Sequence, residues 1–317
     1  MKSRGDYFDN AVNFLPDYPK KILMKIENEL KEKICEVRIR IDSPLSLIIN
    51  SEIYFLSQNG FITEILGNNL VICDKKTVND CFNRLCNFSV YSHINDINKG
   101  FITSDGCSRV GICGRAVCEN GKLTSVRDIT SLNIRIAKEH KGCGNRIIRE
   151  IRSGGEGNIL ITGPPASGKT TILRDLVLSI SSGMLGSFRN ISVVDERREI
   201  FCDADCFDRG INTDVFSSYP KIAGIENALR CMSPDYIVTD EATQQEEIEA
   251  ICSGLNSGVK FILSLHSSSP MDLKNKKIFR ILSDTAKIRY IVFLKSRSAP
   301  GEIESIISSE ELQVKNK

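Results

Sequence analysis

The sequence contains no tryptophan, only three histidines and no strong excess of charge of either sign. Its 42 Lys and Arg residues against 40 Asp and Glu residues give a net charge of +2, which argues against a general nucleic-acid coat or a polybasic membrane sensor. No apolar run approaches the roughly 18 residues of a membrane-spanning helix, and the longest, such as Tyr290 to Leu294, have the length of a strand. The segment from Met1 to Asn10 is charged and polar, without the apolar core of a signal peptide. These absences predict a cytosolic chain.

The 12 cysteines include no C-x-x-C pair, so a common zinc-binding pattern is missing. Cytosolic thiols are usually reduced, and we expect these cysteines to be free and many of them to be buried as small apolar side chains. Two groups contain possible ligands but match no zinc spacing: Cys107, Cys113 and Cys118, and Cys202 and Cys206. We therefore do not predict a metal centre made of cysteines.

The length of 317 residues predicts two domains, since roughly 150 residues form a typical one. The first, residues 1–140, opens with Ile22, Ile26 and Leu30 at helical spacing and continues with short strands in which apolar and polar residues alternate. These strands are predicted at residues 37–41, 45–49, 110–117 and 132–136, with a turn at Asn120-Gly121. The mixture is typical of a small α+β domain.

A connector, residues 141–157, contains a short helix and a glycine-rich segment, Arg152 to Gly157. In the second domain, residues 158–317, apolar strands then alternate with amphipathic helices. Strands are predicted at residues 159–161, 191–194, 236–238, 261–263 and 290–294, with helices around 172–180 and 248–255. Alternation of this kind predicts an α/β fold with a mainly parallel sheet.

The segment Gly163–Thr170 fits the phosphate-loop pattern G-x-x-x-x-G-K-[ST], and it lies between a predicted strand and a predicted helix. Glycines let successive backbone N–H groups point at a phosphate, at the positive end of a helix dipole. Lys169 would place a charge at the β- and γ-phosphates, and the Thr170 hydroxyl would bind Mg²⁺. The alternative is an ordinary glycine-bearing loop with a surface lysine. The predicted nucleotide-binding residues are Gly163, Pro164, Pro165, Ala166, Ser167, Gly168, Lys169, Thr170 and Thr171.

Two predicted strands end in acidic pairs, Asp195-Glu196 and Asp240-Glu241. The second pair follows apolar residues, as in a Walker B strand, so Asp240 would orient the Mg²⁺ shell and Glu241 would polarise the attacking water. The alternative is that Asp240-Glu241 only caps the next helix. His266 ends a neighbouring strand, where a polar side chain can sense the γ-phosphate. A strand between the phosphate loop and the Walker B strand, together with a catalytic glutamate, is typical of motor-type ATPases rather than kinases or GTPases.

This second domain resembles that of the type II and type IV secretion ATPases, hexameric motors with a RecA-like core. Their Walker A loop, acidic box, Walker B strand and histidine box correspond here to Gly163–Thr170, Asp195-Glu196, Asp240-Glu241 and His266. The chain resembles the stage III sporulation AA family more closely still. The blocks that carry this resemblance, within residues 36–306, are 36–40 with Pro44-Leu45, 100–103, 109–115, 127–136, 194–197 and Ser233-Pro234.

The resemblance implies an ATPase of the mother cell that energises a secretion-like channel complex between mother cell and forespore. It also implies a catalytic role for Glu196, a hexameric ring, and other stage III sporulation proteins as partners, one of them membrane-embedded, so that a cytoplasmic chain reaches the membrane through a partner. In secretion ATPases, arginines of the first domain reach the nucleotide, which favours Arg115, Arg127 and Arg135 as catalytic residues. Further candidates in the second domain are Arg197, Arg198 and Arg230. Each could equally be an ordinary surface guanidinium.

Two other functions remain open on the residues alone. A RecA-like nucleic-acid translocase would have a similar core, and Arg38, Arg40, Arg109 and Arg115 would supply phosphate contacts. The small net charge and the absence of a basic and aromatic stacking motif argue against it, so no nucleic-acid partner is expected. The third possibility is a scaffold that binds ATP and barely hydrolyses it.

Overall fold

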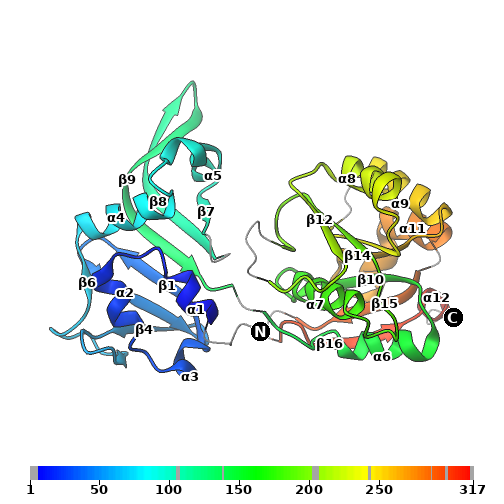
Figure 1. Cartoon of the computed structure of the whole chain (residues 1–317), viewed down its shortest axis with the longest axis horizontal. Coiled ribbons are helices and arrows are strands. Elements are labelled where there is room, and N and C mark those ends of the chain that lie inside the picture. The colour runs from blue at the N-terminus through cyan, green and yellow to red at the C-terminus, as the bar shows by residue number, and fades with distance from the viewer. Residues whose placement is uncertain are drawn as a thin grey trace. The chain divides into compact units, whose positions relative to one another are not determined.

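The computed structural model describes residues 6–104, 108–137, 139–201, 207–241, 244–286, 288–296 and 299–314. The chain divides into two compact units, Met1–Lys138 and Glu139–Lys317 (Figure 1). Within these described ranges, no helix is both long enough and apolar enough to cross a membrane.

The first unit is built on a seven-stranded sheet in which every strand pair is antiparallel. Along the sheet the strands follow the order β5 (Ile62–Thr63), β4 (Glu52–Leu56), β3 (Ser46–Ile49), β1 (Ile34–Arg40), β9 (Lys122–Arg135), β8 (Arg109–Glu119) and β7 (Phe101–Thr103). A small pair joins β2 (Ser43–Pro44) to β6 (Ile72–Cys73). The remaining elements are α1 (Asp6–Ala11), α2 (Asp17–Leu23), α3 (Asn28–Lys31), α4 (Lys75–Leu85), η1 (Val90–His93) and α5 (Ile94–Asn98). The unit is therefore α+β, as the sequence predicts.

The helical opening of the first unit is broken into short helices rather than continuous. At the end of α2, backbone hydrogen bonds join residues three positions apart, from Lys25 N to Ile22 O and from Ile26 N to Leu23 O. The chain then turns before α3 begins at Asn28. Ile22 and Ile26 are both buried in the core, so their spacing indicated burial correctly but did not predict this break.

The hairpin of β8 and β9 turns at Asn120 and Gly121, where the sequence predicts a turn. Both residues have positive φ, 52° and 74°, which is the conformation that Asn-Gly adopts in tight hairpin turns. The predicted strand at 110–117 lies within β8, and the one at 132–136 covers the end of β9 and extends one residue beyond it.

The second unit is an α/β fold whose sheet is parallel except for one edge strand, in agreement with the predicted fold class. Along the sheet lie β12 (Thr213–Ser217), β11 (Ile191–Asp195), β13 (Tyr236–Thr239), β14 (Lys260–His266), β10 (Asn158–Gly163), β15 (Ile288–Leu294) and the antiparallel β16 (Ile303–Ile307). Its helices are α6 (Asn145–Gly154), α7 (Lys169–Ser181), α8 (Lys221–Asn227), η2 (Ala228–Met232), α9 (Gln245–Asn256), α10 (Pro270–Asn275), α11 (Lys277–Ala286) and α12 (Ser309–Val314). Helices α8, α9 and α11 lie together, apart from α6 and α7 (Figure 1).

The strand order determines which side chains can meet. In space, the strand between the phosphate-loop strand β10 and the acidic strand β13 is β14, and β11 lies on the far side of β13. Because these strands are parallel, their carboxyl ends share one edge of the sheet. The phosphate loop, the two acidic pairs and His266 all follow or end strands at that edge.

Two expectations about cysteine fall partly outside the described residues. Cys107, Cys202 and Cys206 are not among the described residues. Cys113 and Cys118 are exposed free thiols on β8, whereas Cys73, Cys81 and Cys86 are buried.

Candidate functional site

The phosphate loop is held in a conformation that requires glycine. Gly168 has a φ of +93°, and a Cβ added there would lie 2.9 Å from the Gly301 Cα and closer still to its backbone nitrogen. The two segments pack this tightly because Gly301 N donates a hydrogen bond to Ser167 O at 2.8 Å. Pro300 and Gly301, just before β16, therefore support the phosphate loop from one side.

The residues of the loop fit a bound phosphate chain. Gly168 directly precedes α7, whose first N–H groups carry the positive end of the helix dipole. The Ser167 hydroxyl is buried and has no hydrogen-bond partner among the described residues. Ala166 also has a positive φ of 60°, so the backbone curls around the space in front of the helix. Thr170 and Thr171 are half-buried in the first turn of α7.

Lys169 is largely buried, with 7 % of its surface exposed, and its ammonium group lies against the loop. It donates to the carbonyl oxygens of Gly163 and Pro164, at 3.1 and 3.0 Å, and lies 2.8 Å from His266 Nδ1. Burial lowers the pKa of Lys169, and the nearby carboxylates of Glu241 and Asp240 oppose that shift.

His266 links this lysine to the predicted general base. Since the Lys169 ammonium can only donate, His266 Nδ1 accepts the hydrogen bond and the ring proton of neutral histidine sits on Nε2. His266 Nε2 lies 3.4 Å from Glu241 Oε2. The structure thus brings Lys169, His266 and Glu241 into one series of contacts at the edge of the sheet.

Asp240 is fixed by a residue that the sequence reasoning missed. Its Oδ1 accepts hydrogen bonds from Ser264 Oγ and from the Glu241 backbone, both at 2.8 Å. Ser264 lies on β14, so this bond joins the ends of two neighbouring strands. The signal in the sequence is a serine two residues before His266 within an otherwise apolar strand, which places both side chains on the same face.

Lys221 is a second missed residue, at the start of α8 and 8 % exposed. Its ammonium donates to the backbone carbonyl of Glu241 and lies 3.8 Å from Glu247 Oε1. The other carboxylate oxygen of Glu247 accepts from the Gln244 backbone, which completes the capping box of α9. Lys221 therefore ties the segment that carries Glu241 to the start of the following helix.

The two residues of the acidic pair at the end of β11, Asp195 and Glu196, lie in different environments. Asp195 is 1 % exposed, and its carboxylate accepts from the backbone nitrogens of Glu199 and Phe201, at 2.8 and 2.7 Å. Burial raises the pKa of Asp195, although these hydrogen bonds oppose the shift. Glu196 is exposed in the following turn. Among the described residues, no hydrogen bond or ion pair joins it to Lys169 or Glu241.

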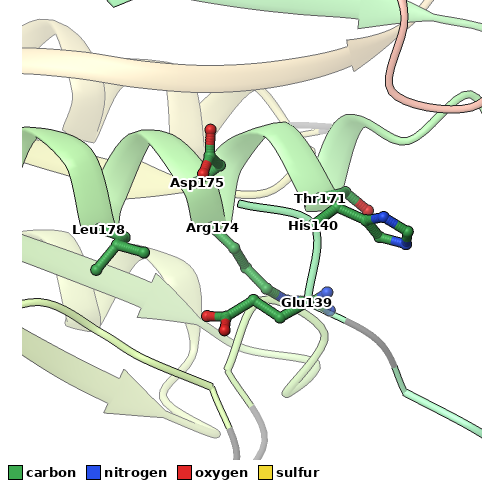
Figure 2. A pocket seen from close by; sticks show the side chains of 6 residues that line it. All are labelled: Glu139, His140, Thr171, Arg174, Asp175 and Leu178. Atoms are coloured by element: carbon green, nitrogen blue, oxygen red, sulfur yellow. The ribbon is translucent and has the colours of Figure 1, made fainter. Parts of the chain in front are cut away.

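A strap of residues 139–144 runs along α7, the helix that follows the phosphate loop. Asp175 on α7 accepts from the backbone nitrogens of Gly142 and Gly144, at 2.7 and 2.6 Å. Figure 2 shows the small crevice between strap and helix, with the His140 ring beside Thr171 at the end nearer the loop. Asp175 thereby holds the strap against the helix that begins at Lys169.

The predicted arginines of the first unit lie on the long hairpin and are exposed. Arg115 pairs with Asp128 at 3.1 Å, and its backbone partner across the hairpin is Arg127. Arg135, near the end of β9, lies 3.4 Å from Glu36. In the second unit, Arg197 and Arg230 are exposed and Arg198 is half-buried.

Comparisons with known proteins agree with this architecture. The profile of the family "Sporulation stage III, protein AA" matches residues 9–314. Stage III sporulation protein AA of Bacillus subtilis is 34% identical over 305 residues, which covers 93% of this chain and 94% of that protein. Among solved structures, the Legionella pneumophila ATPase DotB gives a TM-score of 0.53 at 18% identity, over 88% of this chain and 76% of DotB. The pilus retraction motor PilT with bound ADP gives 0.54 at 15% identity, over 86% and 76%.

The two solved structures show that the chain shares the RecA-like fold of secretion ATPases. The family is shown by a profile that spans nearly all of the chain and by a relative similar over almost its full length. The blocks outside the phosphate-loop motifs had already indicated the same family. The chain therefore belongs to the family of sporulation stage III protein AA.

Proposed function

We propose that this chain is an ATP-hydrolysing motor. The observation that carries the proposal is the series of contacts from Lys169 through His266 to Glu241, at the mouth of a phosphate loop. A phosphate-binding lysine and a carboxylate placed to activate water are the parts that hydrolysis of a nucleoside triphosphate requires. Membership of the sporulation family and the likeness to the ATPases DotB and PilT support it.

In this proposal, residues 163–171 hold the triphosphate through backbone N–H groups and the Lys169 charge. Glu241 accepts a proton from the attacking water. His266, in contact with both Lys169 and Glu241, senses whether the γ-phosphate is present. Thr170 and Asp240 are the residues that would hold Mg²⁺, which supplies charge neutralisation at the phosphates when it is bound. We also propose a catalytic role for Glu196, because of its place in the acidic box.

We also propose that identical chains assemble into a hexameric ring, because head-to-tail interfaces that close form rings. In such a ring Arg115, Arg127 or Arg135 would add positive charge at the nucleotide. The motor would work in the cytoplasm of the mother cell. There it would energise a channel between mother cell and forespore, and reach the membrane through a membrane-embedded stage III sporulation partner. Family membership supports this part of the proposal.

Two substitutions test the chemistry. Glu241→Gln should lower the rate of phosphate release by about 100-fold or more, the usual contribution of a general base, and leave ATP binding intact. Lys169→Ala should abolish ATP binding. The matched control is Glu246→Gln, which neutralises an exposed glutamate in the first turn of α9 and should change neither property.

The outcomes separate the competing functions. If Glu241→Gln hydrolyses ATP as fast as the unaltered chain, the assignment of the general base is wrong. If the unaltered chain binds ATP without measurable turnover, alone or with partners, the scaffold function holds instead. Stimulation by single-stranded DNA that declines steeply with salt would favour a nucleic-acid translocase.

A further inference from the structure

A hollow of about 260 Å³ opens on one face of the sheet in the first unit. It is lined from three neighbouring strands, by Arg38 and Arg40 of β1, Ser131 and Asn133 of β9, and Gly111 and Cys113 of β8. On β1, Arg38 and Arg40 alternate with Val37 and Ile39, which are fully buried in the core on the other face. The hollow therefore lies on the face that the core does not use.

The register of the strands explains why a hollow forms there. One row across the sheet runs from Arg38 to Asn133 and then to Gly111, and the next row runs from Arg40 to Ser131. Gly111 contributes no side chain, and a Cβ added there would meet only Asn133, at an ordinary distance of 3.7 Å. The space beside the two arginines therefore forms because Gly111 has no side chain and Ser131 has a short one.

The charge around the hollow is strongly positive. Arg109 and Arg135 lie opposite each other in the row beyond Asn133. Glu36 contacts two of these arginines: it accepts a hydrogen bond from Arg38 Nη2 at 2.7 Å and lies 3.4 Å from Arg135. Among the described residues, Arg38, Arg40 and Arg135 outnumber this one glutamate, which leaves a surplus of positive charge on one small area of the sheet.

The two lining arginines retain donors for a ligand. A guanidinium group carries five N–H donors. Among the described residues, Arg40 donates one hydrogen bond, from Nη1 to Ser46 Oγ at 3.3 Å. Arg38 uses Nε and Nη2 for Glu36. Both side chains therefore keep N–H groups that can turn to an anion in the hollow.

We propose that this hollow binds a phosphate group, carried by a small soluble anion or by a lipid headgroup. The planar fork of arginine matches two oxygens of a phosphate. A phosphate monoester also carries more than one negative charge near neutral pH, which suits the charge surplus better than a single carboxylate does. The site is separate from the phosphate loop and does not depend on the proposed ATPase activity.

The first test uses inorganic pyrophosphate as the probe, in the full chain with Lys169→Ala so that the phosphate loop does not contribute. Isothermal titration at constant ionic strength should detect binding. Adding Arg38→Ala and Arg40→Ala should weaken it at least ten-fold. Gly111→Val should weaken it similarly, because the new side chain fills the hollow without changing any charge. The control Arg84→Ala removes an exposed arginine on α4 and should have no effect.

The second arm uses vesicles of phosphatidic acid, whose headgroup is a phosphate monoester, in phosphatidylcholine, in a flotation assay with the same variants. Capture that both the double arginine variant and Gly111→Val abolish identifies a lipid headgroup, and binding of pyrophosphate alone identifies a soluble ligand. Far-ultraviolet circular dichroism confirms that each variant is folded. The proposal is overturned if neither probe binds or if Gly111→Val binds as tightly as its parent. It is equally overturned if Arg84→Ala weakens binding as much as the lining variants, or if hexaglutamate binds as tightly as pyrophosphate.

Discussion

Replacing Gly168 by alanine should disrupt the phosphate loop through a collision with Pro300 and Gly301, just before β16. A left-handed backbone costs a residue with a Cβ about 1–2 kcal/mol. Forcing an atom into a filled space costs about 1–3 kcal/mol more, because the new Cβ would lie 2.9 Å from the Gly301 Cα and 3.2 Å from the Pro300 carbonyl carbon. If Gly301 moves away, its hydrogen bond to Ser167 is lost, at about 1 kcal/mol. We expect the free energy of unfolding to fall by about 4 kcal/mol.

The matched control is Gly258→Ala. Gly258 has a similar φ of +85°, but no atom lies within 4 Å of an added Cβ, so only the backbone cost of about 1–2 kcal/mol applies. Urea unfolding followed by circular dichroism measures both variants, and calorimetry measures ATP binding. We expect Gly168→Ala to lose ATP binding and Gly258→Ala to keep it. Equal destabilisation of the two variants would refute this collision.

Two further predictions concern charged groups in the second unit, one buried and one half-buried. Lys221→Met removes the donor to the Glu241 carbonyl and leaves Glu247 without its buried partner. Steady-state kinetics should show kcat lowered about ten-fold at unchanged KM, and urea unfolding should show a loss of about 3 kcal/mol of stability. An unchanged kcat would show that Lys221 does not position Glu241. The hydrogen bond from Arg189, supported by Lys260, lowers the pKa of Glu156, so the stability that this pair contributes is present above the ordinary value of 4.5 and declines as the pH falls through the lowered pKa. Unfolding measured against pH should therefore show a smaller acid-side decline in Glu156→Gln, and identical profiles would contradict this coupling.

The fold of the second unit could be predicted because its central strands are wholly buried. Residues such as those of β11 and β13 form short apolar runs bounded by polar turns, and a strand covered on both faces requires this pattern. The edge strands β12 and β16 were missed, because they contain polar residues and are only half-buried. Helix α4 was missed as well, although Val78, Cys81, Phe82 and Leu85 follow helical spacing and Asp74 caps its first turn.

The candidate site was predictable where chemistry coincides with the end of a strand. Asp240 and His266 could be named because parallel strands bring their carboxyl ends together. Lys221 could not, because it follows the edge strand β12, which the pattern did not reveal. The distinction between Asp195 and Glu196 also needed the structure. The sequence alone does not distinguish two adjacent acidic residues as candidates for a site. The fold does: it buries Asp195, whose carboxylate accepts hydrogen bonds from two backbone N–H groups, and exposes Glu196.

Strand β14 supplies two polar side chains that hold the residues of the candidate site together. Ser264 and His266 are two residues apart and therefore project from the same face of the strand, while Leu263 and Leu265 project from the other and pack in the core. From that one face, Ser264 fixes Asp240, and His266 contacts both Lys169 and Glu241. A change of register by one residue would remove both polar contacts together and place leucines at the site. A polar, apolar, polar triplet at the end of a buried strand is therefore a stronger sign of this site than the histidine alone.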